Sequence, residues 1–265
     1  MGTRLGQNFL MNKAKLRKIA DALELKKGDT VIEIGPGRGE LTKELRIKNK
    51  ELRIIAIEKD AELIKNLEFR IKDLGLDKNI EIIEGDALKE IKNQISKIKN
   101  TDKKSKIVEN LKITGNIPYY ITGYLLRILG ELELKPSLIV LTIQKEVAQR
   151  ITAKPPKMNL LAASAQFWAE PKIIGYIPKK DFRPVPKVDS AIIKFNIKTS
   201  NVQKLKYYKL IKILFKQPRK TIFNNFCGAR NMSVDKCREK LLKAGIDPSD
   251  RPQNLNIEQI KKLSI

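Results

Sequence analysis

The chain has 265 residues, of which 42% are hydrophobic and 32% are charged, and 54 Lys or Arg stand against 30 Asp or Glu. This composition is typical of a globular protein and excludes collagen, a disordered chain and a membrane bundle. The net charge of +24 indicates a polyanionic partner such as nucleic acid, although a lysine-rich proteome would also raise it. The chain has no histidine, which excludes Ser-His-Asp triads, histidine bases and histidine-containing metal sites, and we expect no metal.

The first two hundred residues alternate predicted helices and strands. Helical spacing of apolar residues predicts a helix over 13–25, and apolar runs predict strands at 30–34, 53–57 and 80–83 with helices between them. A helix and a loop are expected over 89–106, and further strands at 113–115, 137–143, 173–177 and 191–196. Repeated strand–helix units are typical of a parallel sheet with crossover helices. The sequence therefore predicts an α/β domain over residues 1–198.

Residues 199–265 form a second, smaller domain that we expect to be all-helical. Between 200 and 265 the chain carries 15 Lys or Arg against 5 Asp or Glu. Lys212 and Lys216 share one predicted helix face, and Arg219 and Lys220 follow at the next turn. A solvated helix surface has the same pattern, so contact of these four cations with RNA phosphates is one of two interpretations.

Cys227 and Cys237 are too few for a disulfide framework and too far apart for a CxxC site, which favours reduced cysteines. The first residues lack the apolar stretch of a signal peptide, and no run approaches the ~18 apolar residues of a membrane span. We therefore expect a cytoplasmic protein without a membrane partner. Nothing resembles a dimer stripe, so we expect a monomer.

A glycine-rich turn follows the first of the predicted parallel strands. Gly35 and Gly37 belong to a GxGxG pattern, which differs from the GxGxxG of dinucleotide sites and from a P-loop. Glu58 ends the next strand, where a carboxylate can accept from both ribose hydroxyls, and Asp86 ends the third, where it can accept from an adenine amino group. Either carboxylate alone could be a helix N-cap. Together they favour S-adenosylmethionine as cofactor, bound beyond the carboxyl ends of the strands.

The segment 116–119 has the groups that methylation of an exocyclic amine requires. The Asn116 side-chain oxygen and the Pro118 carbonyl can accept hydrogen bonds from the amine and direct its lone pair at a methyl group. Tyr119 can stack on a flipped base, a contact worth ~1–3 kcal/mol. The product nitrogen is briefly cationic and loses its proton to solvent, so orientation and electrostatics suffice without a histidine base.

Six segments resemble the motifs of the KsgA/Dim rRNA adenine N6,N6-dimethyltransferases. They are 4–10 (RLGQNFL), 33–39 (EIGPGRG), 58–60 (EKD), 84–87 (EGDA), 116–120 (NIPYY) and 182–190 (FRPVPKVDS), and 217–226 (QPRKTIFNNF) is similar to the basic C-terminal helix of that family. The resemblance implies a Rossmann-like class I S-adenosylmethionine-dependent methyltransferase. It further implies that Asn8, Leu10, Ala87 and Asn116 contact the cofactor, and that Phe182 sandwiches the target adenine against Tyr119.

The activity implied by this resemblance is dimethylation of two adjacent adenosines near the 3′ end of small-subunit rRNA during ribosome biogenesis. The expected partners are that rRNA and the pre-small-subunit particle. Two alternatives remain open, an Erm-type dimethyltransferase acting on large-subunit rRNA and a noncatalytic RNA-binding assembly factor. The C-terminal pattern favours the small subunit over the first, and the intact 116–119 segment favours catalysis over the second.

Overall fold

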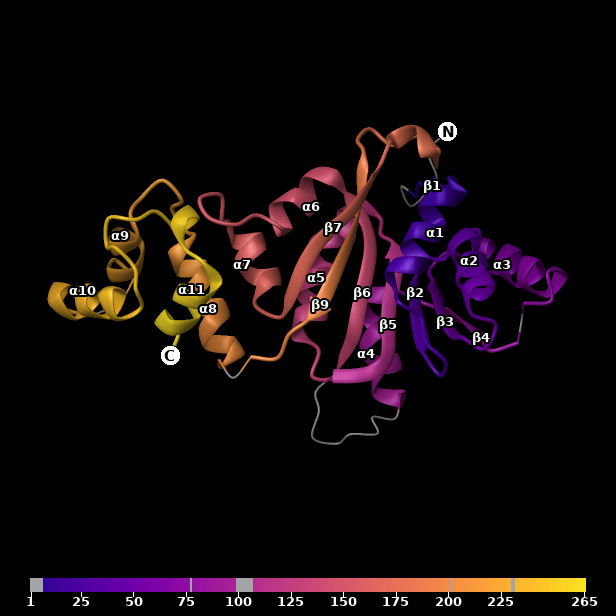
Figure 1. Cartoon of the computed structure of the whole chain (residues 1–265), viewed down its shortest axis with the longest axis horizontal. Coiled ribbons are helices and arrows are strands. Elements are labelled where there is room, and N and C mark those ends of the chain that lie inside the picture. Colours follow the sequence, from indigo (N-terminus) through magenta and orange to yellow (C-terminus); the bar gives the residue numbers. More distant parts are fainter. Residues whose placement is uncertain (1–6, 77, 99–106, 201, 230–231) are drawn as a thin grey trace. The chain divides into compact units, whose positions relative to one another are not determined.

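A computed structural model describes residues 7–76, 78–98, 107–200, 202–229 and 232–265 (Figure 1). The first residues of the 4–10 motif, most of the loop expected before residue 107, and Arg230, a further cation of the basic C-terminal domain, lie outside these ranges. The chain divides into two compact units, one of residues 1–148 and 170–197 and the other of 149–169 and 198–265. No helix in the described ranges has the length and apolar character to cross a membrane.

A mixed sheet forms the centre of the first unit. Among the described residues it has seven strands in the order β4-β3-β2-β5-β6-β9-β7. Their bounds are β2 (Thr30–Ile34), β3 (Arg53–Glu58), β4 (Ile80–Glu84), β5 (Ile107–Asn116), β6 (Lys135–Gln144), β7 (Ala169–Ile177) and β9 (Ser190–Ile197). The five neighbouring strands β4, β3, β2, β5 and β6 pair in parallel, whereas β9 pairs with β6 antiparallel. The predicted α/β class and its strands are confirmed.

Crossover helices join the parallel strands. They are α2 (Glu40–Lys48), α3 (Ala61–Asp73), α4 (Ala87–Lys97) and α5 (Thr122–Glu131), the last preceded by the 3₁₀ turn η1 (Tyr119–Ile121), whereas α1 (Lys13–Ala22) comes before the first of these strands. Asp60 and Asp86 are the N-caps of α3 and α4, and their side chains accept from main-chain N–H groups in the first turn. All five residues of β2 are buried, as expected for a strand covered on both faces.

A short N-terminal strand was not predicted from the sequence. Strand β1 (Phe9–Leu10) pairs antiparallel with β8 (Phe182–Arg183), which follows the 3₁₀ turn η2 (Lys179–Asp181), and Leu10 is opposite Phe182. The Met11 N–H donates to the Asp181 carbonyl at 2.8 Å, which extends this pairing by one contact. The N-terminal segment is thereby held against the proline-rich segment 182–190, which lies more than 170 positions away in sequence.

The second unit is helical. It contains α7 (Leu160–Gln166), α8 (Lys204–Leu214), α9 (Ile222–Cys227), α10 (Val234–Lys243), the 3₁₀ turn η3 (Pro252–Asn254) and α11 (Ile257–Leu263), while α6 (Lys145–Ile151) spans the division between the units. The residues of this unit differ from those expected from a single boundary at residue 198, because residues 149–169 pack with the C-terminal helices and belong to the same unit. The rings of Phe167 and Tyr207 stack at 4.1 Å, and the Tyr207 hydroxyl donates to the Ala163 carbonyl at 3.0 Å.

Candidate functional site

Four parallel strands end at one edge of the sheet, and the predicted site residues follow them. Gly35 comes after β2, Glu58 ends β3, Asp86 comes after β4 and Asn116 ends β5. In register, Ile34 is opposite Ile57 on one side and Gly115 on the other. The structure therefore brings the predicted strand-end residues to the edge at which open α/β sheets bind ligands.

The Glu58 carboxylate is buried and held by main-chain donors. Its Oε2 accepts from the Gly37 N–H at 3.1 Å, and its Oε1 accepts from Lys59 at 2.8 Å and Asp60 at 3.1 Å. The Gln7 Nε2 approaches Oε1 at 3.5 Å. The carboxylate is thus oriented by main-chain groups of the protein, and its contact with Gln7 is longer than the three main-chain contacts.

The glycine turn packs closely against the N-terminal segment. Gly37 has a φ of +55°, and a Cβ at this position would lie 2.7 Å from the Phe9 ring. The Arg38 guanidinium lies 4.8 Å from the centroid of the same ring. A side chain at position 37 would therefore be strained and would also clash, so the turn needs glycine there.

Asp86 and Ala87 lie at the end of the neighbouring strand. The Asp86 Oδ1 accepts from the Leu88 N–H at 2.9 Å, and its Oδ2 pairs with Lys59 Nζ at 3.3 Å. Ala87 is the first residue of α4. The capping role considered for Asp86 is confirmed, while its second oxygen takes part in a partly exposed ion pair, which is weak.

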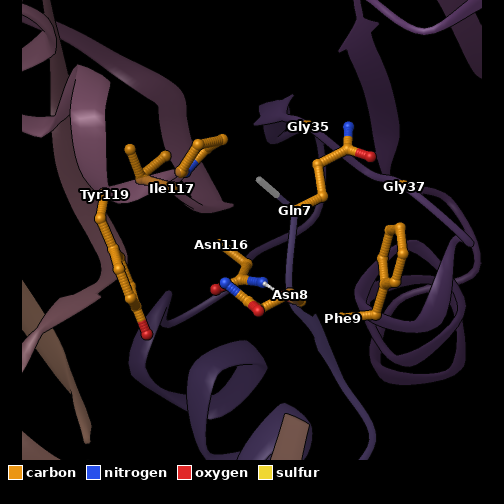
Figure 2. Close-up of a pocket in the computed structure, with 9 residues that line it drawn as sticks. Gln7, Asn8, Phe9, Gly35, Gly37, Asn116, Ile117 and Tyr119 are labelled. Carbon is orange, nitrogen blue, oxygen red and sulfur yellow. Dashed lines mark hydrogen bonds between the residues drawn. The ribbon is translucent and has the colours of Figure 1, made fainter. Parts of the chain in front are cut away.

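A pocket brings together three of the predicted segments (Figure 2). Its lining consists of Gln7, Asn8, Phe9, Gly35, Gly37, Asn116, Ile117, Pro118 and Tyr119. The N-terminal segment, the glycine turn and the segment after β5 thus face a common space. In Figure 2 the Tyr119 ring lies on the opposite side of this space from Phe9.

The Asn116 amide has a defined orientation. Its Nδ2 donates to the Asn8 main-chain carbonyl at 2.6 Å, drawn as the dashed line in Figure 2. Because a planar amide carries its two polar atoms on different sides, the Oδ1 acceptor points away from Asn8. The Ile117 N–H donates to the Thr142 carbonyl at 3.0 Å and anchors the backbone beside the amide.

The next two residues are also fixed. The Pro118 carbonyl accepts from the Ile121 N–H at 3.1 Å, and a carbonyl oxygen has a second lone pair for another donor. The Tyr119 hydroxyl and Ser190 Oγ are 2.9 Å apart, and burial raises the pKa of Tyr119. The tyrosine ring is therefore neutral and held at its outer end, with its face available to the pocket.

The structure differs from the expectation at Phe182. Its side chain is only 1% exposed and belongs to the apolar cluster that includes Leu10 and Leu16. In this structure Phe182 presents no face to a base, because its pairing with Leu10 turns it into the core. Leu10, expected at the cofactor, is itself only 4% exposed and contributes to a second pocket beside Asn116.

Glu33 is a site residue that the sequence reasoning missed. It is buried near the carboxyl end of β2, accepts from the Thr42 hydroxyl at 2.7 Å and lines the second pocket. Desolvation raises its pKa to about 7. The signal was a single carboxylate in an otherwise apolar buried strand, a pattern that is typical of functional rather than packing residues.

The four cations predicted to contact RNA lie in the second unit. Lys212, Lys216, Arg219 and Lys220 are all exposed, on α8 and on the turn that follows it. The turn is fastened by the buried Asn225, whose Nδ2 donates to the carbonyls of Gln217 at 3.0 Å and Thr221 at 3.1 Å. Its Oδ1 accepts from the Gln217 N–H at 3.1 Å.

Comparison with known proteins gives one family. The model of the family described as ribosomal RNA adenine dimethylase matches residues 1–265. A protein named ribosomal RNA small subunit methyltransferase A from Dehalococcoides mccartyi is 37% identical, with 98% of this chain and 86% of that protein covered. One of the same name from Clostridium botulinum is 36% identical, with 98% and 91% covered.

Solved structures show the same fold. A dimethyladenosine transferase from Plasmodium falciparum has a TM-score of 0.76 at 27% identity, covering 96% of this chain and 95% of that one. The 23S rRNA methyltransferase ErmE has a TM-score of 0.74 at 23% identity, covering 97% and 98%. The second likeness concerns the fold alone.

Proposed function

Because the chain belongs to the ribosomal RNA adenine dimethylase family, we propose that it dimethylates the N6 amines of two adjacent adenosines near the 3′ end of small-subunit rRNA, with S-adenosylmethionine as methyl donor. The relatives that are 36–37% identical carry small-subunit names, which favours this reading over the Erm alternative. The observation that carries the proposal for this chain is the orientation of Asn116 in its pocket.

The cofactor fits the residues at the strand ends. We propose that Glu58 binds the ribose and that Asp86 and Ala87 bind the adenine. The Gly35–Gly37 backbone, Asn8 and Leu10 would contact the rest of the cofactor. The fit rests on the buried, preoriented Glu58 carboxylate and on the turn that admits no side chain at Gly37. S-adenosylmethionine supplies an electrophilic methyl group on a sulfonium.

Asn116 and Pro118 orient the amine. The hydrogen bond from Nδ2 to the Asn8 carbonyl orients the Asn116 amide so that its Oδ1 can accept from one N6–H. The second lone pair of the Pro118 carbonyl can accept from the other N6–H. Two acceptors draw the amine hydrogens to one side, so the nitrogen lone pair points to the other. The Asn116 acceptor is preset, which avoids reorganisation during transfer.

Tyr119 holds the base, and the leaving proton requires no buried base. The Ser190 contact holds the hydroxyl end of the ring in place, and an adenine can stack on the ring face that lines the pocket. After transfer the nitrogen is cationic and acidic, and its proton passes to solvent through the open side of the pocket.

Contact with rRNA is assigned to the second unit. The exposed cations at 212, 216, 219 and 220 are suited to phosphates, and Asn225 presents Arg219 and Lys220 on a fixed turn. We further propose that the substrate is the pre-small-subunit particle and that the protein acts as a cytoplasmic monomer. The free state of both cysteines is consistent with a reducing compartment.

The test is methyl transfer from labelled S-adenosylmethionine to small-subunit particles that lack the modification. Asn116→Ala should lower the rate by about 100- to 1000-fold, since it removes a preset acceptor of the transition state, and should leave RNA binding unchanged. Asn93→Ala, an exposed asparagine on α4, is the matched control. A mark found only on large-subunit rRNA would establish the Erm alternative, and binding without transfer by the wild type would establish the noncatalytic one.

A further inference from the structure

An exposed aromatic stripe begins beside the target-base pocket. Tyr120 is 69% exposed and Tyr124 is 56% exposed, and Tyr120 directly follows Tyr119, which lines the pocket. Tyr120 lies in the 3₁₀ turn η1 that leads into α5, and Tyr124 and Arg127, three residues apart, share one face of α5. The stripe therefore consists of two tyrosines and Arg127, and it starts at the pocket rim.

These tyrosines differ from Tyr207 and Tyr208 of the second unit, of which the first is buried and the second is half-buried. The Tyr207 and Tyr208 hydroxyls donate to the carbonyls of Ala163 and Ser164, and both rings contact Phe167. Their role is packing. Tyr120 and Tyr124 instead leave most of their surface to solvent, where aromatic rings are suited to stacking on a partner.

A glycine lies between the two tyrosines. Gly123 is exposed in the first turn of α5, and a Cβ there would have no atom within 4 Å. Neither packing nor a positive φ requires glycine at this position, although glycine is unfavourable in helices relative to alanine. The bare backbone leaves room for a flat group to approach between the rings.

Arg127 adds a positive charge to the same face. Its side chain is 69% exposed and its Nε donates to Glu131 at 2.9 Å. An exposed pair of this kind is weak, so the guanidinium can exchange the carboxylate for a phosphate. Exposed aromatic rings alternating with cations are typical of surfaces that bind single-stranded nucleic acid.

We propose that Tyr120 and Tyr124 stack on nucleotides that adjoin the target adenosine, while Arg127 contacts a phosphate of the same strand. This inference rests on the proposed function and deepens it by assigning the path of the RNA strand. A base held against Tyr119 leaves its neighbours at the pocket rim, where the stripe begins. Stacking accepts any base, so the stripe contributes affinity and register rather than base identity.

The test measures binding of a fluorescent single-stranded RNA that contains the two adjacent adenosines, and KM and kcat on unmodified small-subunit particles. Tyr120→Ala and Tyr124→Ala should each weaken RNA binding and raise KM about tenfold to a hundredfold, with kcat and cofactor affinity unchanged. Tyr124→Phe should bind RNA as the wild type does, whereas Tyr124→Leu should resemble the alanine variant. Phe69→Ala removes an aromatic side chain that is 73% exposed on α3 and is the matched control.

The stripe proposal is overturned if the tyrosine variants bind RNA as tightly as Phe69→Ala does, or if Tyr124→Leu retains full affinity. Thermal unfolding verifies that each variant is folded, which we expect because the replaced side chains are exposed. RNA binding is measured without turnover. If the wild type transfers no methyl group, the proposed function fails while the binding comparison still decides the role of the stripe.

Discussion

The strand-end pocket and the basic turn of the second unit hold their polar groups in opposite ways. At the strand ends, the Glu58 carboxylate is buried and fastened by three main-chain donors, and the Asn116 amide is fastened by a main-chain carbonyl. In the second unit, Arg219 and Lys220 are exposed, and only the turn beneath them is fastened. Chemistry on a single nitrogen needs fixed groups, whereas a phosphate backbone is bound by charges that adapt to it.

The larger effect on ligand binding should come from the strand-end pocket, where the polar groups are held by the main chain. Glu58→Ala should weaken binding of S-adenosylmethionine by about 100-fold, because the ribose loses a charge-assisted acceptor and the Gly37, Lys59 and Asp60 N–H groups lose theirs. Isothermal titration calorimetry measures the change, with Glu62→Ala, an exposed carboxylate on α3, as control. Unchanged affinity would remove Glu58 from the cofactor site.

Glu33 tests whether burial at the strand ends is costly. Its pKa in the folded protein, raised to about 7, exceeds the ordinary value of 4.5. The buried carboxyl group therefore does not destabilise the fold below pH 4.5 and destabilises it fully above pH 7. Glu33→Gln should therefore increase the free energy of unfolding by about 2–3 kcal/mol at pH 8, a gain that disappears toward pH 4.5.

Urea unfolding at pH 5 and pH 8 measures this gain, and the exposed Glu62→Gln supplies the baseline. An equal change in the free energy of unfolding at both pH values would show that the shape of the side chain, and not its charge, determines the effect of Glu33→Gln.

The basic turn should give the smallest changes. Replacing Arg219 and Lys220 by alanine should weaken RNA binding about tenfold and reduce the slope of log K against log salt by about 1.4, the share of two single-strand phosphate contacts. Asn225→Ala should also weaken RNA binding, by releasing the turn, but should leave that slope unchanged because both cations remain. Asn224→Ala, exposed and adjacent, is its control. Identical slopes for the wild type and the double variant would mean that these two side chains are solvated and make no contact with RNA phosphates.

Local pattern was sufficient for most of the sheet and for the strand-end residues. The positions of Glu58 and Asp86 follow from strand–turn–helix order, and Asn116 follows from a four-residue motif. The burial of Phe182 could not be predicted, because it depends on the pairing of β1 with β8 across most of the first unit. Residues 149–169 were misassigned for a related reason: the contact of Phe167 with Tyr207 joins segments that have no local signal in common.

The hydrogen bond from Asn116 to Asn8 has a consequence for how this protein tolerates change. The acceptor is a peptide carbonyl, which every residue type supplies at position 8. Exchanging that side chain leaves the acceptor in place, while a slip of the β1–β8 pairing by one residue would move it by about 3.3 Å. The orientation of the Asn116 amide is therefore sensitive to the register of β1 against β8 and insensitive to the identity of residue 8. Substitutions at position 8 alone would overlook this contact, whereas variants that shift the β1–β8 pairing would reveal it.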